Sequence, residues 1–551
     1  MAAIGGLVLD AGFPGLGWWP LTFVGLAMLF VALGRDSARW NFVVGTVFGT
    51  AFFVPHLHWI DGTVGAVPWL ALSLAEAAII GLFGVAWSWA RRGAVTWTRA
   101  RLQVPVFAVL WVGVEELRAV WPFQGFPWGR VAFSQADGPL GQFARLGGVP
   151  LVSGLAACLG PLLALGFLAA RRLDVGVASA LLLASLAVVG GGWLVPLDSA
   201  AQSGRLTIGA VQGNVPNRGL DSFDQARQVL DNHVAGTAAL LDSVSPGELD
   251  VVLWPENSSD IDPRVDAAAA TQITAVAQQL QAPILVGTQH YPETGGRLNT
   301  ALLWDPEAGP VESYAKQHPA PFAEYIPLRD LARRFSSAVD RVRTDMIPGS
   351  AEGILHLRSA HLDRVVPIGV GICFEVAYDD IIRDDVAGGA ELLVIPTNNA
   401  NFGMSDESTQ QLAMSQLRAI EHGRATVQIS TVGVSAIISP AGVVRDRTEL
   451  FTPAQLVATV PLRTELTPAT RYGDWITWGF RGLALVVVAA GMAGARRVPR
   501  AERAVARPAP PWRLPSTRPG GKGRSSQSRR GAAGRTATST RRSVPKARVG
   551  R

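Results

Sequence analysis

Residues 369–375 read GVGICFE, an apolar run that ends in Cys373, Phe374 and Glu375. The chain of 551 residues contains one other cysteine, Cys158. Two cysteines provide no disulfide framework, and the different surroundings of these two argue against a bond between them. A cysteine at the end of a strand instead indicates reactivity, because a thiol attacks as its thiolate and needs a base or a cation nearby.

Two other expected strands end in residues that supply those groups. The stretch LWPE ends at Glu256, and SYAKQHPAPF carries Lys316. A glutamate can take the thiol proton, and a lysine can stabilise the thiolate and then an oxyanion. The backbone N–H of Phe374 offers a second oxyanion donor. These groups predict an acyl-transfer site, although the residue types alone leave open a structural cysteine with two unrelated charges.

The block 196–473 is predicted to be an α/β domain, because short apolar runs alternate with helical patterns. Continuous apolar strands indicate buried sheets with reactive residues at the strand ends. Helices are expected over 221–243 and 263–281. The expected strands are LTIGAVQ, DVVLWPE, PILVGTQ, TALLWD, VESYAK, VVPIGVGICFE, AELLVIPTNN, ATVQISTVG and SAIISP.

The composition indicates a membrane protein with a large water-exposed part. Hydrophobic residues make up 48% of the chain, charged residues only 17%, and the mean hydropathy is +0.24. The 17 tryptophans agree, because Trp collects at membrane–water interfaces. Apolar runs predict eight spans, at 3–16, 18–34, 41–58, 67–90, 103–120, 149–170, 175–195 and 475–493. Only the Gly/Pro-rich stretch FPGLGWWP separates the first two, so a short or re-entrant first segment remains open.

The positive-inside rule orients these spans, because four arginine clusters fall on one side of the membrane. We therefore expect a transmembrane domain over 1–195, an extracytoplasmic catalytic domain over 196–473, a last span over 474–494 and a basic, disordered cytoplasmic tail over 495–551. The arginines are Arg35 and Arg39; Arg91, Arg92, Arg99 and Arg101; Arg171 and Arg172; and Arg496, Arg497 and Arg500.

The net charge of +6 hides an uneven distribution. The tail 495–551 holds 17 Lys and Arg residues and one acid, Glu502, so it carries +16 and the rest of the chain −10. We therefore expect no nucleic-acid partner for the body. For the tail, contact with anionic lipid headgroups and plain solvation both remain open.

The order WPE, YAKxHxxPFxEY and GICFE resembles the nitrilase superfamily with its Glu-Lys-Cys triad. Together with the spans, it resembles the apolipoprotein N-acyltransferase family over residues 1–495. GFPWGRVAFSQ at 125–135, FPGLGWWPLTFVGLAML at 13–29, QGNVP at 212–216 and RAIEHGR at 418–424 support the same likeness. The resemblance implies a multi-pass α-helical membrane domain plus an α/β nitrilase-like αββα sandwich.

The resemblance also implies roles. Cys373 would be the nucleophile, Glu256 the general base and Lys316 the residue that stabilises the tetrahedral intermediate. Glu324 and Glu375 would support this triad. The acyl donor would be a phospholipid and the acceptor a diacylglyceryl-lipoprotein, with a thioester between the two half-reactions and no cofactor. We expect a monomer in the plasma (inner) membrane.

Two alternatives differ in class: a membrane-tethered amidase or nitrile hydrolase, and an inactive domain that scaffolds another membrane enzyme. The intact triad argues against the scaffold, and the location near lipid argues against the hydrolase. TNNANFG departs from the family by placing Asn401 where an aromatic residue is common, which concerns lipid docking. Two groups of acidic residues are interpreted as structural. We expect Glu115 and Glu116 to cap the span or to form local ion pairs. We expect a solvated helix face to carry Asp379, Asp380, Asp384 and Asp385.

Overall fold

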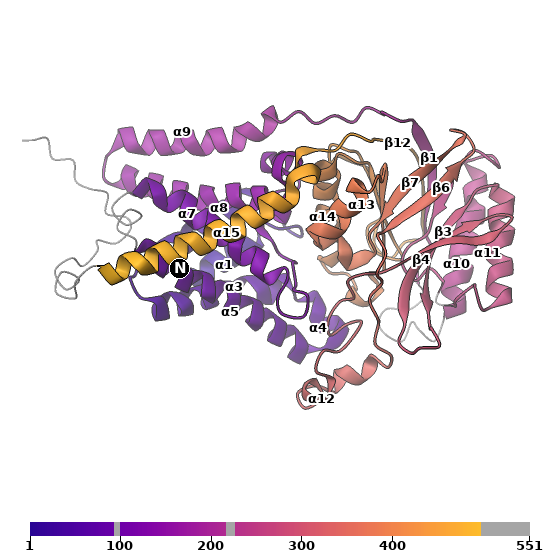
Figure 1. Ribbon diagram of the computed structural model, residues 1–551, viewed down its shortest axis with the longest axis horizontal. Coiled ribbons are helices and arrows are strands. Elements are labelled where there is room, and N and C mark those ends of the chain that lie inside the picture. Colours follow the sequence, from indigo (N-terminus) through magenta and orange to yellow (C-terminus); the bar gives the residue numbers. More distant parts are fainter. Residues whose placement is uncertain (93–99, 216–225, 260, 498–551) are drawn as a thin grey trace, which may run out of the picture. The chain divides into compact units, whose positions relative to one another are not determined.

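A computed structural model describes residues 1–92, 100–215, 226–259 and 261–497. The expected tail after 497, Arg99 and Arg500 lie outside these residues. In the first 195 residues the chain forms helices, and a further long helix closes the described part (Figure 1). These helices are α1 (Ala2–Asp10), α2 (Pro20–Ala32), α3 (Ala38–His56), α4 (Trp59–Val64), α5 (Ala66–Arg91), α7 (Ala100–Arg118), α8 (Ala144–Arg171), α9 (Val175–Gly191) and α15 (Pro468–Arg497).

Among the described residues, four helices are long and apolar enough to cross a membrane: Ala66–Arg91, Pro139–Arg171, Val175–Leu194 and Pro468–Ala495. The first expected span is not a full one. Its helix ends at Asp10 after nine residues, whereas a bilayer needs about 20. The glycines and proline that follow turn the chain, and Gly15 and Gly17 have φ of 118° and 69°. The last helix begins at Pro468, before the expected 474.

The block between α9 and α15 contains two sheets, each six-stranded in the described part of the chain. Both have parallel central strands and antiparallel edges. The first has the order β12 (Ala454–Pro461), β1 (Arg205–Gln212), β2 (Val251–Leu253), β3 (Ile284–His290), β4 (Leu298–Asp305), β5 (Gly309–Ala315). The second has the order β11 (Val444–Arg447), β10 (Ala436–Ile438), β9 (Thr426–Ser430), β8 (Leu392–Thr397), β7 (Arg364–Val370), β6 (Ile354–Ser359).

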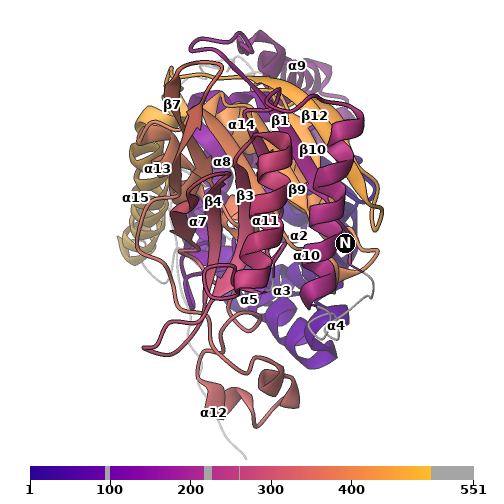
Figure 2. The same ribbon diagram turned by 90° about the vertical axis from the view of Figure 1, so that its right-hand side faces the viewer.

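The sheets pack face to face over an apolar core that contains Ile208 of β1, Ile368 of β7 and Val394 of β8. Helices α10 (Ala226–Ala238) and α11 (Ala267–Leu280) lie side by side over the first sheet (Figure 2). In α11 the apolar positions 269, 273, 276, 277 and 280 share one buried face, as the helical period requires. Helices α13 (Asp379–Ala387) and α14 (Glu407–His422) follow strands of the second sheet and complete the αββα order. The sandwich predicted from the sequence is therefore confirmed.

The layer of α13 and α14 also packs against the membrane helices. One continuous cluster of buried apolar residues joins Phe30, Phe83 and Val152 of the N-terminal helices to Ile381 of α13 and Leu417 of α14. The segment between α7 and α8 contributes Trp128 and Phe133 to the same cluster. Because this segment is buried between the two parts, it fixes where the two-sheet block meets the membrane helices.

Candidate active site

The three residues singled out in the sequence follow three different strands. Glu256 lies three residues after β2, Lys316 directly after β5, and Cys373 three residues after β7. The two sheets bring these ends together, and the side chains of Glu256 and Lys316 are only 4% and 1% exposed. The convergence expected at the strand ends is thus present in the fold.

Lys316 is the cation at the centre of the site. Its Nζ lies 2.8 Å from Glu324 Oε1 and 3.5 Å from Glu256 Oε1. Burial alone would lower the pKa of Lys316, but the carboxylates of Glu324 and Glu256 outweigh it and raise the pKa. The ammonium group therefore stays charged where an oxyanion would need it. Glu324 also accepts a 2.6 Å hydrogen bond from the backbone N–H of Ala320, which fixes the turn after Lys316.

Glu256 is held by two donors besides the lysine. Its Oε1 accepts a 2.5 Å hydrogen bond from Asn299 Nδ2, and its Oε2 a 2.8 Å hydrogen bond from the backbone N–H of Asn398. Burial raises the pKa of Glu256, while Lys316 and the hydrogen bond from Asn299 partly oppose it. A buried carboxylate with a raised pKa close to a thiol suits the role of a general base.

Cys373 occupies a tight turn. It starts the 3-10 helix η7 (Cys373–Ala377) with φ of 54°, a left-handed conformation that is unfavourable for a residue with a Cβ. Its Sγ lies 3.5 Å from Thr397 Oγ1 and 3.7 Å from Gln411 Nε2. Burial and the Glu256 charge raise the pKa of the thiol, and Lys316 lowers it in part. The thiol is therefore protonated at rest and needs a base for attack. Phe374 follows in the first turn of η7, where backbone N–H groups lack helical partners.

Glu375 makes contacts that its sequence position did not reveal. Its fully buried carboxylate accepts hydrogen bonds from the backbone N–H groups of Gln317 (2.6 Å), His318 (3.1 Å) and Ile372 (2.7 Å), and from the Tyr314 hydroxyl (2.9 Å). One carboxylate thus ties the segment of Lys316 to the turn of Cys373. Burial raises the pKa of Glu375 to about 7.

A layer of polar side chains beneath the cysteine was missed in the sequence. Thr397 Oγ1 lies 2.9 Å from Gln411 Oε1, and Asn399 Nδ2 lies 3.0 Å from the same atom and 2.7 Å from Glu407 Oε2. Thr397 ends β8, Asn399 follows two residues later, and Glu407 and Gln411 belong to α14. The sequence signal was the run of polar residues ESTQQ at the start of α14, and the structure buries Glu407, Ser408, Gln410 and Gln411 of this run. Buried polar side chains need hydrogen-bond partners, and the residues of this layer supply them to one another.

The loop that carries Asn401 contacts the membrane part. The backbone carbonyl of Asn401 accepts a 3.0 Å hydrogen bond from Thr63 of α4. The Phe402 ring packs edge-on against Trp59, with the centroids 4.9 Å apart. The position at which this chain departs from the family pattern is therefore a docking point between α4 and the catalytic block.

Two acidic interpretations from the sequence are wrong in part. Asp380 and Asp384 are exposed, as expected for a solvated helix face. Asp379 is not on that face, since it pairs with Arg130 at 2.7 Å and Arg418 at 2.8 Å, and Asp385 is 1% exposed. Glu116 does not pair locally, because its partners are Arg130 at 2.5 Å and Arg481 at 3.0 Å. The ion-pair partners of these acids lie on other elements of the fold, so they cannot be predicted from the helical pattern of the sequence.

This arrangement matches the needs of acyl transfer through a thioester. The Glu256 carboxylate can take the Cys373 proton as sulfur attacks a carbonyl, and the Lys316 ammonium and the Phe374 N–H can face the oxyanion. The same groups can then act in reverse as an amine attacks the thioester.

An αββα sandwich with glutamate, lysine and cysteine at converging strand ends defines the nitrilase class of enzymes. The carbon-nitrogen hydrolase family model matches residues 212–468, and the model of the apolipoprotein N-acyltransferase N-terminal domain matches residues 5–162. The chain belongs to the apolipoprotein N-acyltransferase family and is an acyltransferase embedded in a membrane.

Similar proteins are found in several bacteria. The apolipoprotein N-acyltransferase of Mycolicibacterium smegmatis is 42% identical over 86% of this chain and 81% of that protein. That of Azotobacter vinelandii is 32% identical over 89% of this chain and 93% of that protein. Among solved structures, an amidase from Nesterenkonia sp. is 18% identical, with a TM-score of 0.33, and covers 48% of this chain and 93% of its own.

Proposed function

We propose that this chain transfers an acyl chain from a phospholipid to the N-terminal amine of S-diacylglyceryl-cysteine in lipoproteins. Cys373 attacks the ester carbonyl, Glu256 takes the thiol proton, and the lysophospholipid leaves with a proton. The free amine then attacks the thioester at Cys373. An amide forms and the thiol is restored, so atoms and protons balance over the two half-reactions.

The convergence of three residues from separate strands carries this proposal. Lys316 Nζ lies 3.5 Å from Glu256 Oε1. Cys373 has a left-handed backbone conformation, and the Glu256 charge raises the pKa of its thiol. Glu324, Glu375 and the Phe374 N–H complete the set of supporting groups. The family membership supports the choice of lipid donor and lipoprotein acceptor, because the similar proteins bear that name.

The two lipid substrates also suit a membrane-anchored site. We infer that residues 1–195 and 474–494 anchor the catalytic block 196–473 on the extracytoplasmic face of the inner membrane, with the tail 495–551 in the cytoplasm. Because membrane-spanning segments precede and follow the block in the chain, the active site stays at the bilayer surface, where both lipid substrates lie. We further infer a monomer without nucleic-acid partners.

Mass spectrometry of lipoprotein N-termini tests the reaction. Cells that carry Cys373→Ala as their sole acyltransferase should keep the diacylglyceryl group and lose the N-acyl group. Cys158→Ala is the matched control and should leave N-acylation intact, because Cys158 lies in α8, outside the catalytic block. Unchanged N-acylation in the Cys373→Ala strain would refute the proposal.

Trapping the intermediate separates the proposed function from simple hydrolysis. The purified enzyme incubated with phospholipid should gain a hydroxylamine-labile acyl group on Cys373 and none on Cys158. A membrane-tethered amidase or nitrile hydrolase would instead release free acid from amides and transfer nothing to a lipoprotein amine. That pattern, without acylation from phospholipid, would favour the alternative.

A further inference from the structure

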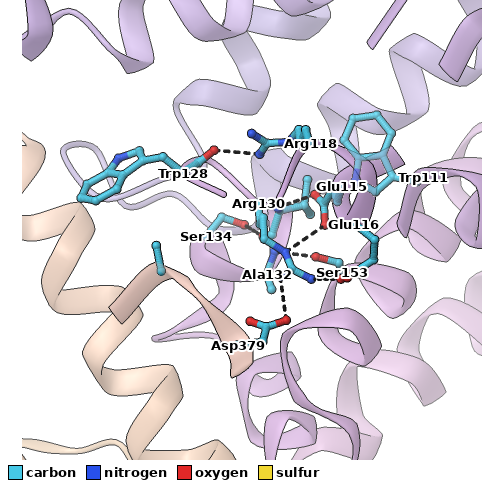
Figure 3. Close-up of polar contacts among 12 residues, drawn as sticks. Trp111, Glu115, Glu116, Arg118, Trp128, Arg130, Ala132, Ser134, Ser153 and Asp379 are labelled. Carbon is cyan, nitrogen blue, oxygen red and sulfur yellow. Dashed lines mark hydrogen bonds and ion pairs between the residues drawn. The ribbon is translucent and has the colours of Figure 1, made fainter. Parts of the chain in front are cut away.

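Arg130 bridges the membrane helices and the catalytic block (Figure 3). It lies between α7 and α8, and its side chain is 1% exposed. Its Nη1 donates a 2.7 Å hydrogen bond to Asp379 Oδ2 at the start of α13. Its Nη2 donates a 2.5 Å hydrogen bond to Glu116 Oε1 on α7. One planar group therefore contacts both parts of the protein through two different nitrogens.

The membrane side of this bridge extends to a second helix. Glu116 Oε2 accepts a 3.0 Å hydrogen bond from Arg481 Nη2 of α15. The neighbouring Glu115 accepts hydrogen bonds from Trp111 Nε1 at 2.9 Å and from the backbone N–H of Val131 at 2.8 Å. The segment that carries Arg130 is thereby fixed to α7, and α7 is fixed to α15.

The catalytic side of the bridge leads to the nucleophile turn. Asp379 Oδ1 accepts a 2.8 Å hydrogen bond from Arg418 Nη2 of α14. Arg418 also donates to the backbone carbonyls of Val376 at 2.9 Å and Ala377 at 3.0 Å. These carbonyls belong to the last two residues of η7, the 3-10 helix that begins at Cys373. Two ionised side chains, Asp379 and Arg418, thus link Arg130 to the turn that begins at Cys373.

Stability alone is a poor explanation for such a network. Buried ion pairs often contribute no more to folding than well-packed apolar residues would, and their best-attested use is to fix one arrangement among several. Although burial opposes ionisation, Arg130 and Arg418 lower the pKa of Asp379 far below its ordinary value. The carboxylate between the two arginines is therefore charged, and its geometry is set from both sides.

We propose that Arg130 is a positioning residue, which holds the Cys373 turn in place through Asp379 and Arg418 and couples that turn to α7 and α15. This inference rests on the proposed role of Cys373 as the nucleophile. It assigns to a loop of the membrane part an indirect influence on thiol reactivity, through Asp379 and Arg418. Because the acyl donor lies in the bilayer, the bridge keeps the nucleophile in a fixed position relative to the membrane helices.

The variant Arg130→Lys tests the bridge while it keeps the buried charge. A lysine ammonium cannot reproduce the two-sided contact of a guanidinium fork, so one partner is lost. We expect the alkylation rate of Cys373 by iodoacetamide to fall about tenfold in the purified full-length enzyme, because small misplacements of reacting groups have large effects. Cys158 serves as an internal reference, since loss of the fold would change its alkylation as well.

Two further variants complete the design. Asp379→Asn should lower Cys373 alkylation similarly, and in combination with Arg130→Lys it should add little, because the two residues act through one contact. Arg383→Lys is the matched control. Arg383 also links α13 to α15, through Asp474 at 2.9 Å, yet has no contact with η7 through this path, so Cys373 alkylation should stay unchanged.

Normal Cys373 alkylation in folded Arg130→Lys and Asp379→Asn proteins would overturn the inference. If only one variant folds, that variant decides. Failure of both to fold would also overturn it, because the pair would then serve folding and not positioning. The alkylation readout needs no lipid substrate. Failure of the proposed acyl transfer in the Cys373→Ala strain would therefore be distinguishable from failure of this inference.

Discussion

Trp128 Nε1 donates a 2.7 Å hydrogen bond to Gln410 Oε1, across 282 residues of sequence. The Trp128 ring also stacks on Phe374, which follows the proposed nucleophile Cys373, with an interplanar angle of 7° and centroids 5.9 Å apart. Gln411, next to Gln410, contacts the Cys373 sulfur. Trp128, in the segment between α7 and α8, therefore contacts two elements of the site. These are α14, whose Gln411 touches the Cys373 sulfur, and Phe374, which follows Cys373.

Trp128→Phe should destabilise the protein. The phenyl ring keeps part of the stack but leaves the buried Gln410 oxygen without its donor, which costs about 1–3 kcal/mol. Thermal unfolding of the detergent-solubilised enzyme should show a lower midpoint. Trp193→Phe is the control, since Trp193 is 69% exposed. Equal midpoints for the two variants would contradict this prediction.

Lys316→Met should lower acyl-enzyme formation by about 10²-fold or more, because the oxyanion loses its buried cation. Glu324→Gln should have a smaller effect, since Lys316 keeps its contact with Glu256. The measurement is the rate of hydroxylamine-labile acylation of Cys373 after mixing with phospholipid. A larger loss in Glu324→Gln than in Lys316→Met would contradict the assigned roles.

The rate of acyl-enzyme formation should depend on pH through the ionisation of Glu256. Burial raises its pKa above the ordinary value of 4.5, and only the ionised carboxylate can accept the thiol proton. The rate should therefore fall as the pH drops through this raised pKa, and the midpoint should lie above 4.5. Glu256→Gln should abolish the rate at every pH. A profile that stays flat down to pH 4.5 would rule out this base.

Glu407→Gln should stabilise the protein at high pH. Burial raises the pKa of Glu407 from 4.5 to about 8, so the folded state favours the protonated form. The stability that this group contributes is complete below pH 4.5 and is lost as the pH rises through about 8. The gain in unfolding midpoint of the variant over the parent should therefore grow between these two pH values. A constant difference would contradict the raised pKa.

The orientation can be tested with single added cysteines. Asp330→Cys lies in the catalytic block at a fully exposed side chain, and Leu173→Cys lies between α8 and α9 at 85% exposure. A membrane-impermeant maleimide added to intact cells should label the first and not the second, relative to the parent chain. After lysis both should be labelled. The reverse pattern in intact cells would invert the proposed topology.

The sequence singled out Glu256, Lys316 and Cys373 as candidate catalytic residues. Each follows an apolar strand, and the motifs around them resemble the nitrilase superfamily, which can be recognised without coordinates. The alternation of strand and helical runs predicted an α/β domain, and the resemblance to the family implied the αββα sandwich. The Gly/Pro-rich stretch FPGLGWWP also indicated a turn after the first apolar segment, and the structure shows that the first helix is short and ends at Asp10.

What the sequence by itself determined is the class of fold, the family and the reactive side chains. Only the tertiary structure decided what each charge contacts. Glu375 joins the Lys316 segment to the Cys373 turn, and Arg130 joins Asp379 to Glu116. Hydrogen bonds and ion pairs act over about 3 Å, whereas these partners lie far apart along the chain. Residue type and spacing therefore predict which groups can react, and the packing of the sheets and helices determines their partners.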